Sequence, residues 1–210
     1  MLGSVPSDYL IKITEHLVLS LSALGLGCLV ALPLGILISS NKKLTQTVIS
    51  ISSILQTIPS LALFAMIVPI MGVGKIPAIV ALFIYSLLPI LRNTVLGMQG
   101  VDENLIDAAK GMGFTLPQII FQVKIPMAIS VMMSGVRLSA IYVLAWTSLA
   151  SYIGAGGLGD YIFAGMNNYN IPLIIYGTVP IVLSGLVLDF ILSKLELKLV
   201  PKMKSDEVIS

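Results

Sequence analysis

Five stretches of this sequence are long and apolar enough to cross a lipid bilayer, and they limit the possible folds more than any other feature. They cover about residues 15–39, 45–70, 76–98, 127–150 and 171–193. A helix needs about 20 mainly apolar residues to span a hydrocarbon core of ~30 Å. Charged residues make up only 10% of the 210 residues, against roughly 25% in soluble domains. Because the backbone in lipid must satisfy its own hydrogen bonds, we expect an all-α membrane protein with five transmembrane helices.

The basic residues are distributed unevenly between the two sides of the membrane that five spans define. Lys12 and Lys75 fall on one side, and Arg137 falls inside the fourth span. The other side holds the remaining nine, which are Lys42, Lys43, Arg92, Lys110, Lys124, Lys194, Lys198, Lys202 and Lys204. Because loops rich in Lys and Arg stay in the cytoplasm, we expect the N-terminus outside and the C-terminus inside. The expected parts are an external segment (1–14), a transmembrane domain (15–198) and a cytoplasmic tail (199–210).

A polar segment, residues 99–125, separates the third and fourth spans on the expected cytoplasmic side. Its acidic residues come first and Lys110 follows, an order that suits the dipole of one short helix. Gly111 and Gly113 are expected to end that helix, and a second short helix is expected at about 116–122. Helices this short are not stable alone. They must therefore pack on their own bundle or in the groove of a partner.

The spacing within this segment matches a known loop. The sequence reads Asp107-Ala108-Ala109, three residues, Gly113, nine residues, Val123-Lys124-Ile125-Pro126. It resembles the loop of import-type ABC transporter permeases, whose pattern is Glu-Ala-Ala, three residues, Gly, nine residues, Ile-x-Leu-Pro. The three departures from this pattern are conservative, with Asp in place of Glu, Val in place of Ile and Ile in place of Leu. The resemblance implies that a helix with the Ala pair docks on an ATP-hydrolysing subunit, with the coupling residues Asp107, Ala108, Ala109, Gly111, Gly113 and Pro126.

Two further runs resemble one branch of these permeases, the branch for uptake of glycine betaine, carnitine and choline. They are residues 88–94 and 153–159, within a resemblance that covers roughly 15–195. It implies the five-helix core of methionine-type importers, in a bacterial plasma membrane. The implied partners are two ATP-binding subunits, a second permease copy or a paralogue, and an extracellular or periplasmic substrate-binding protein, with no nucleic acid. ATP and Mg²⁺ would bind in the ATPase, because this chain has no P-loop and is expected to bind no cofactor or metal itself.

Alternatives remain open at this stage. The same scaffold would suit ergothioneine, a bile-type compound or an amino acid as solute. A secondary transporter or channel would call for intramembrane carboxylates that couple ions or for a repeated half, and the sequence suggests neither. A membrane-embedded enzyme would call for paired acids and bases, a nucleophile or a metal cluster. We find none of these in the spans, and we therefore expect no catalytic residues.

Several residues inside the spans are candidates for a translocation pathway. Tyr142 and Trp146 are four apart and share a helix face, and Tyr85 lies in the third span. Aromatic faces attract quaternary ammonium groups, but the same residues suit helix packing or an aromatic belt. Arg137 is costly inside a membrane and must face a cavity or a partner. Its side chain would snorkel toward the cytoplasmic end, hold a helix pair or form part of a gate.

The expected outer side carries a glycine-rich loop with Gly154, Gly156, Gly157 and Gly159. The resemblance suggests that it caps the outer mouth or enters the membrane, and a flexible connector is the alternative. Three single residues are given simpler roles. We expect His16 and Asp189 at the membrane interfaces, and Cys28 as a buried structural cysteine.

Overall fold

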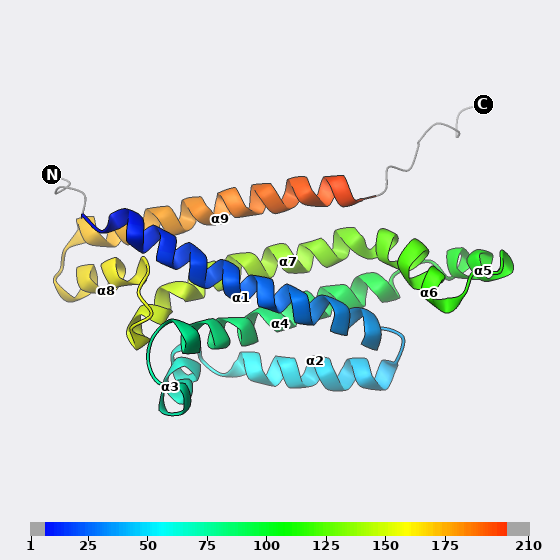
Figure 1. Ribbon diagram of the computed structural model, residues 1–210, viewed down its shortest axis with the longest axis horizontal. Coiled ribbons are helices and arrows are strands. Elements are labelled where there is room, and N and C mark those ends of the chain that lie inside the picture. Colours follow the sequence, from blue (N-terminus) through cyan, green and yellow to red (C-terminus); the bar gives the residue numbers. More distant parts are fainter. Residues whose placement is uncertain (1–6, 201–210) are drawn as a thin grey trace.

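The computed structural model describes residues 7–200, and this part of the chain is helical without strands. The expected segment 1–14, the tail 199–210 and the residues Lys202 and Lys204 therefore lie partly or wholly outside the described residues. The helices are α1 (Tyr9–Ile38), α2 (Lys42–Thr57), α3 (Ser60–Met71), α4 (Lys75–Gln99), α5 (Glu103–Gly111), α6 (Leu116–Gln118), the π-helical turn η1 (Ile119–Lys124), α7 (Ile125–Thr147), the 3-10 helix η2 (Ser148–Ile153), α8 (Gly159–Asn167) and α9 (Ile171–Leu199). The long helices α1, α4, α7 and α9 run along the long axis of the molecule (Figure 1).

The centre of the bundle is built from α1, α4 and α7, which pack closely along their lengths. A stripe of small residues on α1 makes this possible, because Ala23, Gly27, Ala31 and Gly35 are all buried. A Cβ atom added at Gly35 would lie 2.7 Å from the side chain of Thr94 on α4. Gly27 faces Ser86 in the same way. The small residues of this stripe thus let α1 and α4 approach closely, as is common where helices pack in lipid.

The second apolar stretch is not one straight span, which corrects the prediction for residues 45–70. It forms α2 and α3, which are bent by 93° at a short break. Pro59 explains the break, since proline lacks an N–H group and disfavours helical geometry in the residue before it. Ile58 is accordingly extended, with ψ of 125°. Residues 7–200 therefore contain four unbroken helices that are long and apolar enough to cross a membrane, and a fifth span only if the bent pair counts as one.

The prediction of a separate short helix at about 116–122 is also wrong. Residues Leu116–Ile153 form one continuous helical rod of 38 residues that includes the fourth span. Pro126 fits inside this rod because the preceding turn is widened to π geometry, with the Ile125 N–H donating to the Ile120 carbonyl. A wider turn relieves the clash between a proline ring and the carbonyl four residues earlier. The polar segment is thus joined rigidly to α7.

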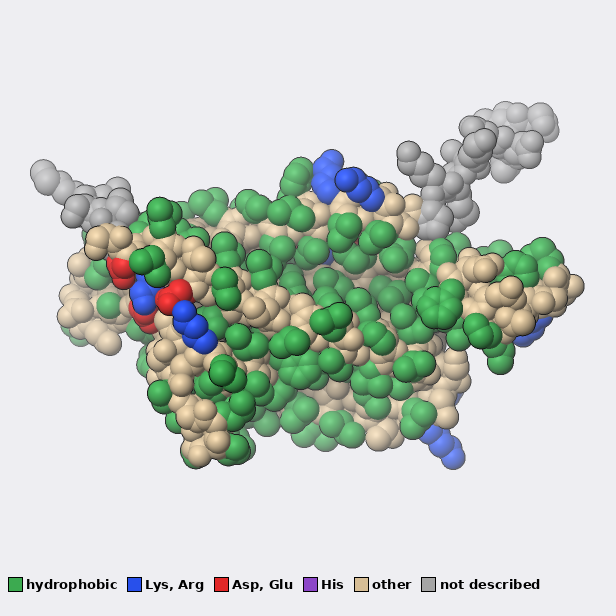
Figure 2. Space-filling model, viewed as in Figure 1, with side chains coloured by type: hydrophobic (Ala, Val, Ile, Leu, Met, Phe, Trp, Pro, Cys, Tyr) green, Lys and Arg blue, Asp and Glu red, His purple; other side chains and the backbone are tan. Residues whose placement is uncertain are grey.

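The surface of the bundle is apolar around its middle. Figure 2 shows hydrophobic side chains over most of this face, with the visible acidic side chains gathered beside basic ones at the left end and further basic side chains at the top and at the right end. Exposed Leu, Ile and Val side chains on α1 and α9 supply much of that apolar surface. Such a distribution is typical of a protein whose middle is covered by lipid.

Candidate functional site

The polar segment folds into α5, which projects past the ends of the long helices (Figure 1). Its first turn is capped by Asp102, whose carboxylate accepts the Asn104 N–H at 2.9 Å. Glu103 lies in the first turn and Lys110 in the last, which matches the helix dipole. The prediction of a short helix in this segment is confirmed. Both of its ends are tied to long helices of the bundle, α4 before it and the rod 116–153 after it.

The two alanines of the motif have different environments. Ala108 is exposed, whereas Ala109 is 1% exposed and packs toward the chain itself. Its carbonyl accepts the Phe114 N–H at 3.1 Å, and α5 packs on η1. Ala108 is therefore the alanine that a partner could approach, and Ala109 lets α5 lie close to its own rod.

Asp107 lies on the exposed side of α5. Its carboxylate pairs with Lys110 at 2.9 Å, with both side chains largely in solvent. A pair of this kind contributes little to stability. Both groups are therefore free to exchange their partner for a charged group on another protein.

The two glycines at the end of α5 also differ. Gly111 is the last helical residue, and a side chain there would meet open space. Gly113 has φ of +82°, in the left-handed region, although a Cβ atom there would also meet open space. The requirement for glycine at 113 is therefore conformational and not steric. Pro126, the last motif residue, lies two turns along the rod, just after η1.

Large apolar side chains are exposed around α5. They are Leu105, Met112, Leu116 and Phe121. Apolar groups gathered on a projecting surface are typical of a site that another protein covers.

The aromatic candidates form one row. The ring centroids of Tyr142 and Trp146 are 5.3 Å apart, and those of Trp146 and Tyr85 are 4.5 Å apart. Tyr85 is 2% exposed, and its hydroxyl donates to the Ile58 carbonyl that the break at Pro59 leaves free. Tyr85 therefore packs the α2–α3 break against α4. Tyr142, at the other end of the row, is partly exposed.

Arg137 holds a helix pair. Its guanidinium donates two hydrogen bonds to Asp189 on α9, at 2.8 and 3.0 Å, and one to Glu196 at 3.3 Å. Ser130 donates to the other oxygen of Glu196. The interfacial depth expected of Asp189 stays a prediction, and its partly exposed carboxylate forms a two-pronged ion pair with Arg137. Because Arg137 and Asp189 are 52 positions apart in the sequence, no local pattern predicted their pairing.

The glycine-rich loop is packed and not a free connector. Gly154, Gly156 and Gly157 all have positive φ. The Gly157 N–H donates to the Glu15 carboxylate at 3.2 Å, and a Cβ atom at Gly157 would lie 3.4 Å from His16. Gly159 begins α8 so close to the Ser148 carbonyl that no side chain would fit. The loop therefore rests on the start of α1.

His16 is fully buried, which corrects its expected interfacial position. Its Nε2 lies 3.1 Å from the Leu144 carbonyl on α7. That carbonyl becomes available because the helix tightens from α to 3-10 geometry at Ser148, whose N–H turns to Ala145. The Nδ1 atom has no hydrogen-bond partner among residues 7–200. A histidine in an apolar run at the start of a span was the only sequence signal for this contact.

Ion pairs that the sequence analysis missed link α1 to α4 and α8 at the same end. Lys12 pairs with Asp160, and Lys75 pairs with Glu15 at 2.8 Å. Asp8 accepts a hydrogen bond from the Tyr161 hydroxyl at 2.6 Å. This bond lowers the pKa of Asp8, while burial and the neighbouring carboxylate raise the pKa of Tyr161. These contacts hold the glycine-rich loop and α8 against the bundle.

The fold is that of a solved importer. A chain of the MetNI methionine ABC transporter, in inward-facing conformations, superposes with a TM-score of 0.83. The match covers 94% of this chain and 100% of the other, at 23% sequence identity. The expected fold class is thereby confirmed.

Sequence relatives are closer still. The carnitine transport permease protein OpuCB of Listeria monocytogenes is 56% identical over 93% of this chain and 89% of its own length. The choline transport system permease protein OpuBB of Bacillus subtilis is 50% identical over 92% of this chain and 89% of its own. The glycine betaine/carnitine/choline transport system permease protein OpuCB of the same organism is also 50% identical, over 93% of this chain and 90% of its own length. The family model for binding-protein-dependent transport system inner membrane components matches residues 24–205. The chain therefore belongs to this family of inner membrane transport permeases.

Proposed function

We propose that this chain is the permease subunit of an ATP-driven importer for quaternary ammonium osmoprotectants, namely glycine betaine, carnitine and choline. Support comes from the relatives at 50–56% identity, whose names specify carnitine, choline or all three solutes. The permease moves its solute by alternating between inward-open and outward-open states. The N-terminus lies outside and the C-terminus in the cytoplasm, as the bias of basic residues predicts.

The observation that carries the ATP-driven mechanism is the attachment of α5. This helix is exposed, projects from the bundle and is packed on η1, at the start of a 38-residue rod. A pull on α5 therefore reaches α7 without crossing a flexible joint. Because α7 packs along α4 and α1, the pull would shift the centre of the bundle. Closure of two ATPase subunits on ATP would supply this movement.

The partners follow from the same proposal. Two ATP-binding subunits hold ATP and Mg²⁺ and receive α5 in a groove. Four unbroken spans and one broken pair are few for an enclosed path, so a second permease chain, identical or paralogous, completes it. An extracellular or periplasmic binding protein delivers the solute to the end of the bundle that carries the glycine-rich loop.

Reconstitution tests the proposal. The permease, its ATPase and the cognate binding protein are placed in proteoliposomes, and uptake of radiolabelled choline, carnitine and glycine betaine is measured. Accumulation is expected only with ATP on the ATPase side. Accumulation that needs an ion gradient and no ATP would show a secondary transporter. Uptake of ergothioneine, a bile-type compound or an amino acid in place of the three solutes would move the chain to another substrate class.

A further inference from the structure

The helix α2 differs in composition from the other long helices. Eight of its sixteen residues are Ser, Thr or Gln. Two of these, Thr45 and Ser52, are buried toward the bundle. Four others recur at intervals of four, three and four residues, which places them on one helix face. We name these four the α2 polar face: Gln46, Ser50, Ser53 and Thr57.

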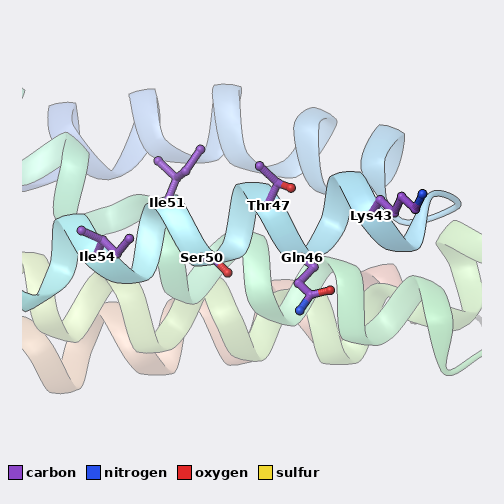
Figure 3. A pocket seen from close by; sticks show the side chains of 6 residues that line it. All are labelled: Lys43, Gln46, Thr47, Ser50, Ile51 and Ile54. Atoms are coloured by element: carbon purple, nitrogen blue, oxygen red, sulfur yellow. The ribbon is translucent and has the colours of Figure 1, made fainter.

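The α2 polar face points away from the bundle. Gln46, Ser50 and Thr57 are exposed, and Ser53 is half-buried. Figure 3 shows Gln46 and Ser50 on the same side of the helix, with Lys43 at its beginning. The outer surface of α2 is also hollowed beside Thr47, Ile51 and Ile54 (Figure 3). The face is therefore open for contact with something outside this chain.

The exposure of polar side chains on α2 is informative because α2 lies beside helices that are expected to cross the membrane. α2 lies beside α4 and α1, which are membrane-spanning by length and composition, and it runs alongside α1 in Figure 1. The exposed side chains of those spans are apolar, such as Leu29 and Leu37 on α1. The Thr57 hydroxyl donates to the Ile54 carbonyl of its own helix, whereas the side chains of Gln46 and Ser50 have no such bond within residues 7–200. Hydroxyl and amide groups that face hydrocarbon without partners are costly. The α2 polar face therefore faces water or a polar partner and not lipid.

We infer that the α2 polar face lines the path along which the solute crosses the membrane. This inference rests on the proposed import function and names the surface that the solute passes. Uncharged hydroxyls and an amide offer a trimethylammonium solute several weak oxygen contacts and no fixed charge that would hold or repel it. Binding sites for transported solutes near the middle of the membrane are commonly formed by discontinuous helices, and α2 ends at such a break.

The end of the face is held in a defined position. Thr57 is the last residue of α2, and the next carbonyl, that of Ile58, accepts the hydrogen bond from Tyr85. From there α3 turns away at 93°. The α2 polar face thus runs from Gln46 to a break, and Tyr85 of the aromatic row holds that break through its bond to Ile58. The aromatic row positions the path, and the α2 polar face contacts the solute.

Cysteine labelling in the assembled transporter tests this inference. Cys28 is the single cysteine of the chain, so a Cys28→Ser background carries Ser50→Cys or Ser53→Cys, both nearly isosteric. The probe is 2-(trimethylammonium)ethyl methanethiosulfonate, which is water-soluble and carries the head group of choline. The cysteine thiolate attacks the sulfenyl sulfur, so a disulfide forms and methanesulfinate leaves. Leu29→Cys on α1 and Leu186→Cys on α9, both at exposed apolar positions, are the matched lipid-facing controls.

The α2 variants are expected to react at least about tenfold faster than the controls, because a thiol in lipid is rarely ionised. The transported solute at saturating concentration should slow their labelling, and labelling should stop uptake. Rates no faster than those of Leu29→Cys overturn the inference. So does ready disulfide formation between two Ser50→Cys chains without any effect of solute, which would show a contact between permeases. Labelling rates without solute do not depend on which solute is carried, so a failure of the proposed import function would appear separately, in the uptake of the Cys28→Ser protein.

Discussion

Arg137 on α7 and Asp189 on α9 face each other in a two-pronged ion pair, with nitrogen–oxygen distances of 2.8 and 3.0 Å. This pair explains how α9 stays on the bundle. Among the residues of α9, Gly177 is buried while large apolar side chains point outward. Along the second half of this helix, the partly buried Leu188 and Leu192 supply the apolar packing, and the charges add the specific contact.

We expect Arg137→Ala to lower the melting temperature of the purified protein by several degrees, because it leaves two carboxylates without their cation. Arg137→Lys should recover part of the loss, since lysine keeps the charge but not the planar fork. Lys194→Ala is the matched control, because that exposed cation lies over Phe190 on the same helix. Equal melting temperatures for Arg137→Ala and Lys194→Ala would contradict the role of the pair.

Gly113 and Gly111 offer a matched test of the end of α5. Alanine at Gly113 must adopt φ near +82°, which costs roughly 1–2 kcal/mol, whereas alanine at helical Gly111 is favourable. Gly113→Ala should insert normally yet reduce solute uptake per ATP hydrolysed, because the turn after α5 shifts. Uptake and ATPase rates are measured on the same proteoliposomes. Normal coupling in Gly113→Ala, or equal losses in both variants, would count against this account.

Substitutions of the two alanines of the motif should have different effects. Ala108→Leu places a larger side chain on the exposed side of α5 and should weaken copurification of the ATPase without changing the melting temperature of the permease alone. Ala109→Leu overpacks the contact with η1 and should destabilise the permease by about 1–3 kcal/mol. Copurification yield and thermal unfolding separate the two effects. The reverse pattern would mean that α5 docks through its other side.

His16 is expected to support the end of the bundle that carries the glycine-rich loop. His16→Leu removes the contact to the Leu144 carbonyl and leaves a buried acceptor unpaired, at a cost of about 1–3 kcal/mol. His16→Gln keeps a donor and should lose less. Hydrogen exchange of residues 148–160 reports the effect locally. Unchanged exchange in His16→Leu would show that the contact contributes nothing.

The parts of this fold that follow from hydrophobic length could be predicted, and those that follow from packing could not. The spans, the small-residue stripe on α1 and the capped helix at 103–111 each depend on residues close together in the sequence. The pairing of Arg137 with Asp189 and the burial of His16 depend on helix positions that no local pattern specifies. A short helix was expected at about 116–122, and the widened turn η1 instead carries the rod on through Pro126. Pro59 indicated an interruption, while the 93° bend depends on packing of α3 against α4 and η2.

Cross-linking from α5 tests the central claim, that this helix is the connection to an ATPase, most directly. Ala108→Cys in the Cys28→Ser background is alkylated with a maleimide that carries a photoactivatable benzophenone, and the assembled complex is then irradiated, so that the benzophenone inserts into a C–H bond of the neighbouring chain. Tyr152→Cys, exposed near the glycine-rich loop, is the control at the opposite end of the rod. We predict a covalent product of permease and ATPase subunit from Ala108→Cys alone, and a change in its yield when ATP is bound. No product from Ala108→Cys, or an equal product from Tyr152→Cys, would contradict the account.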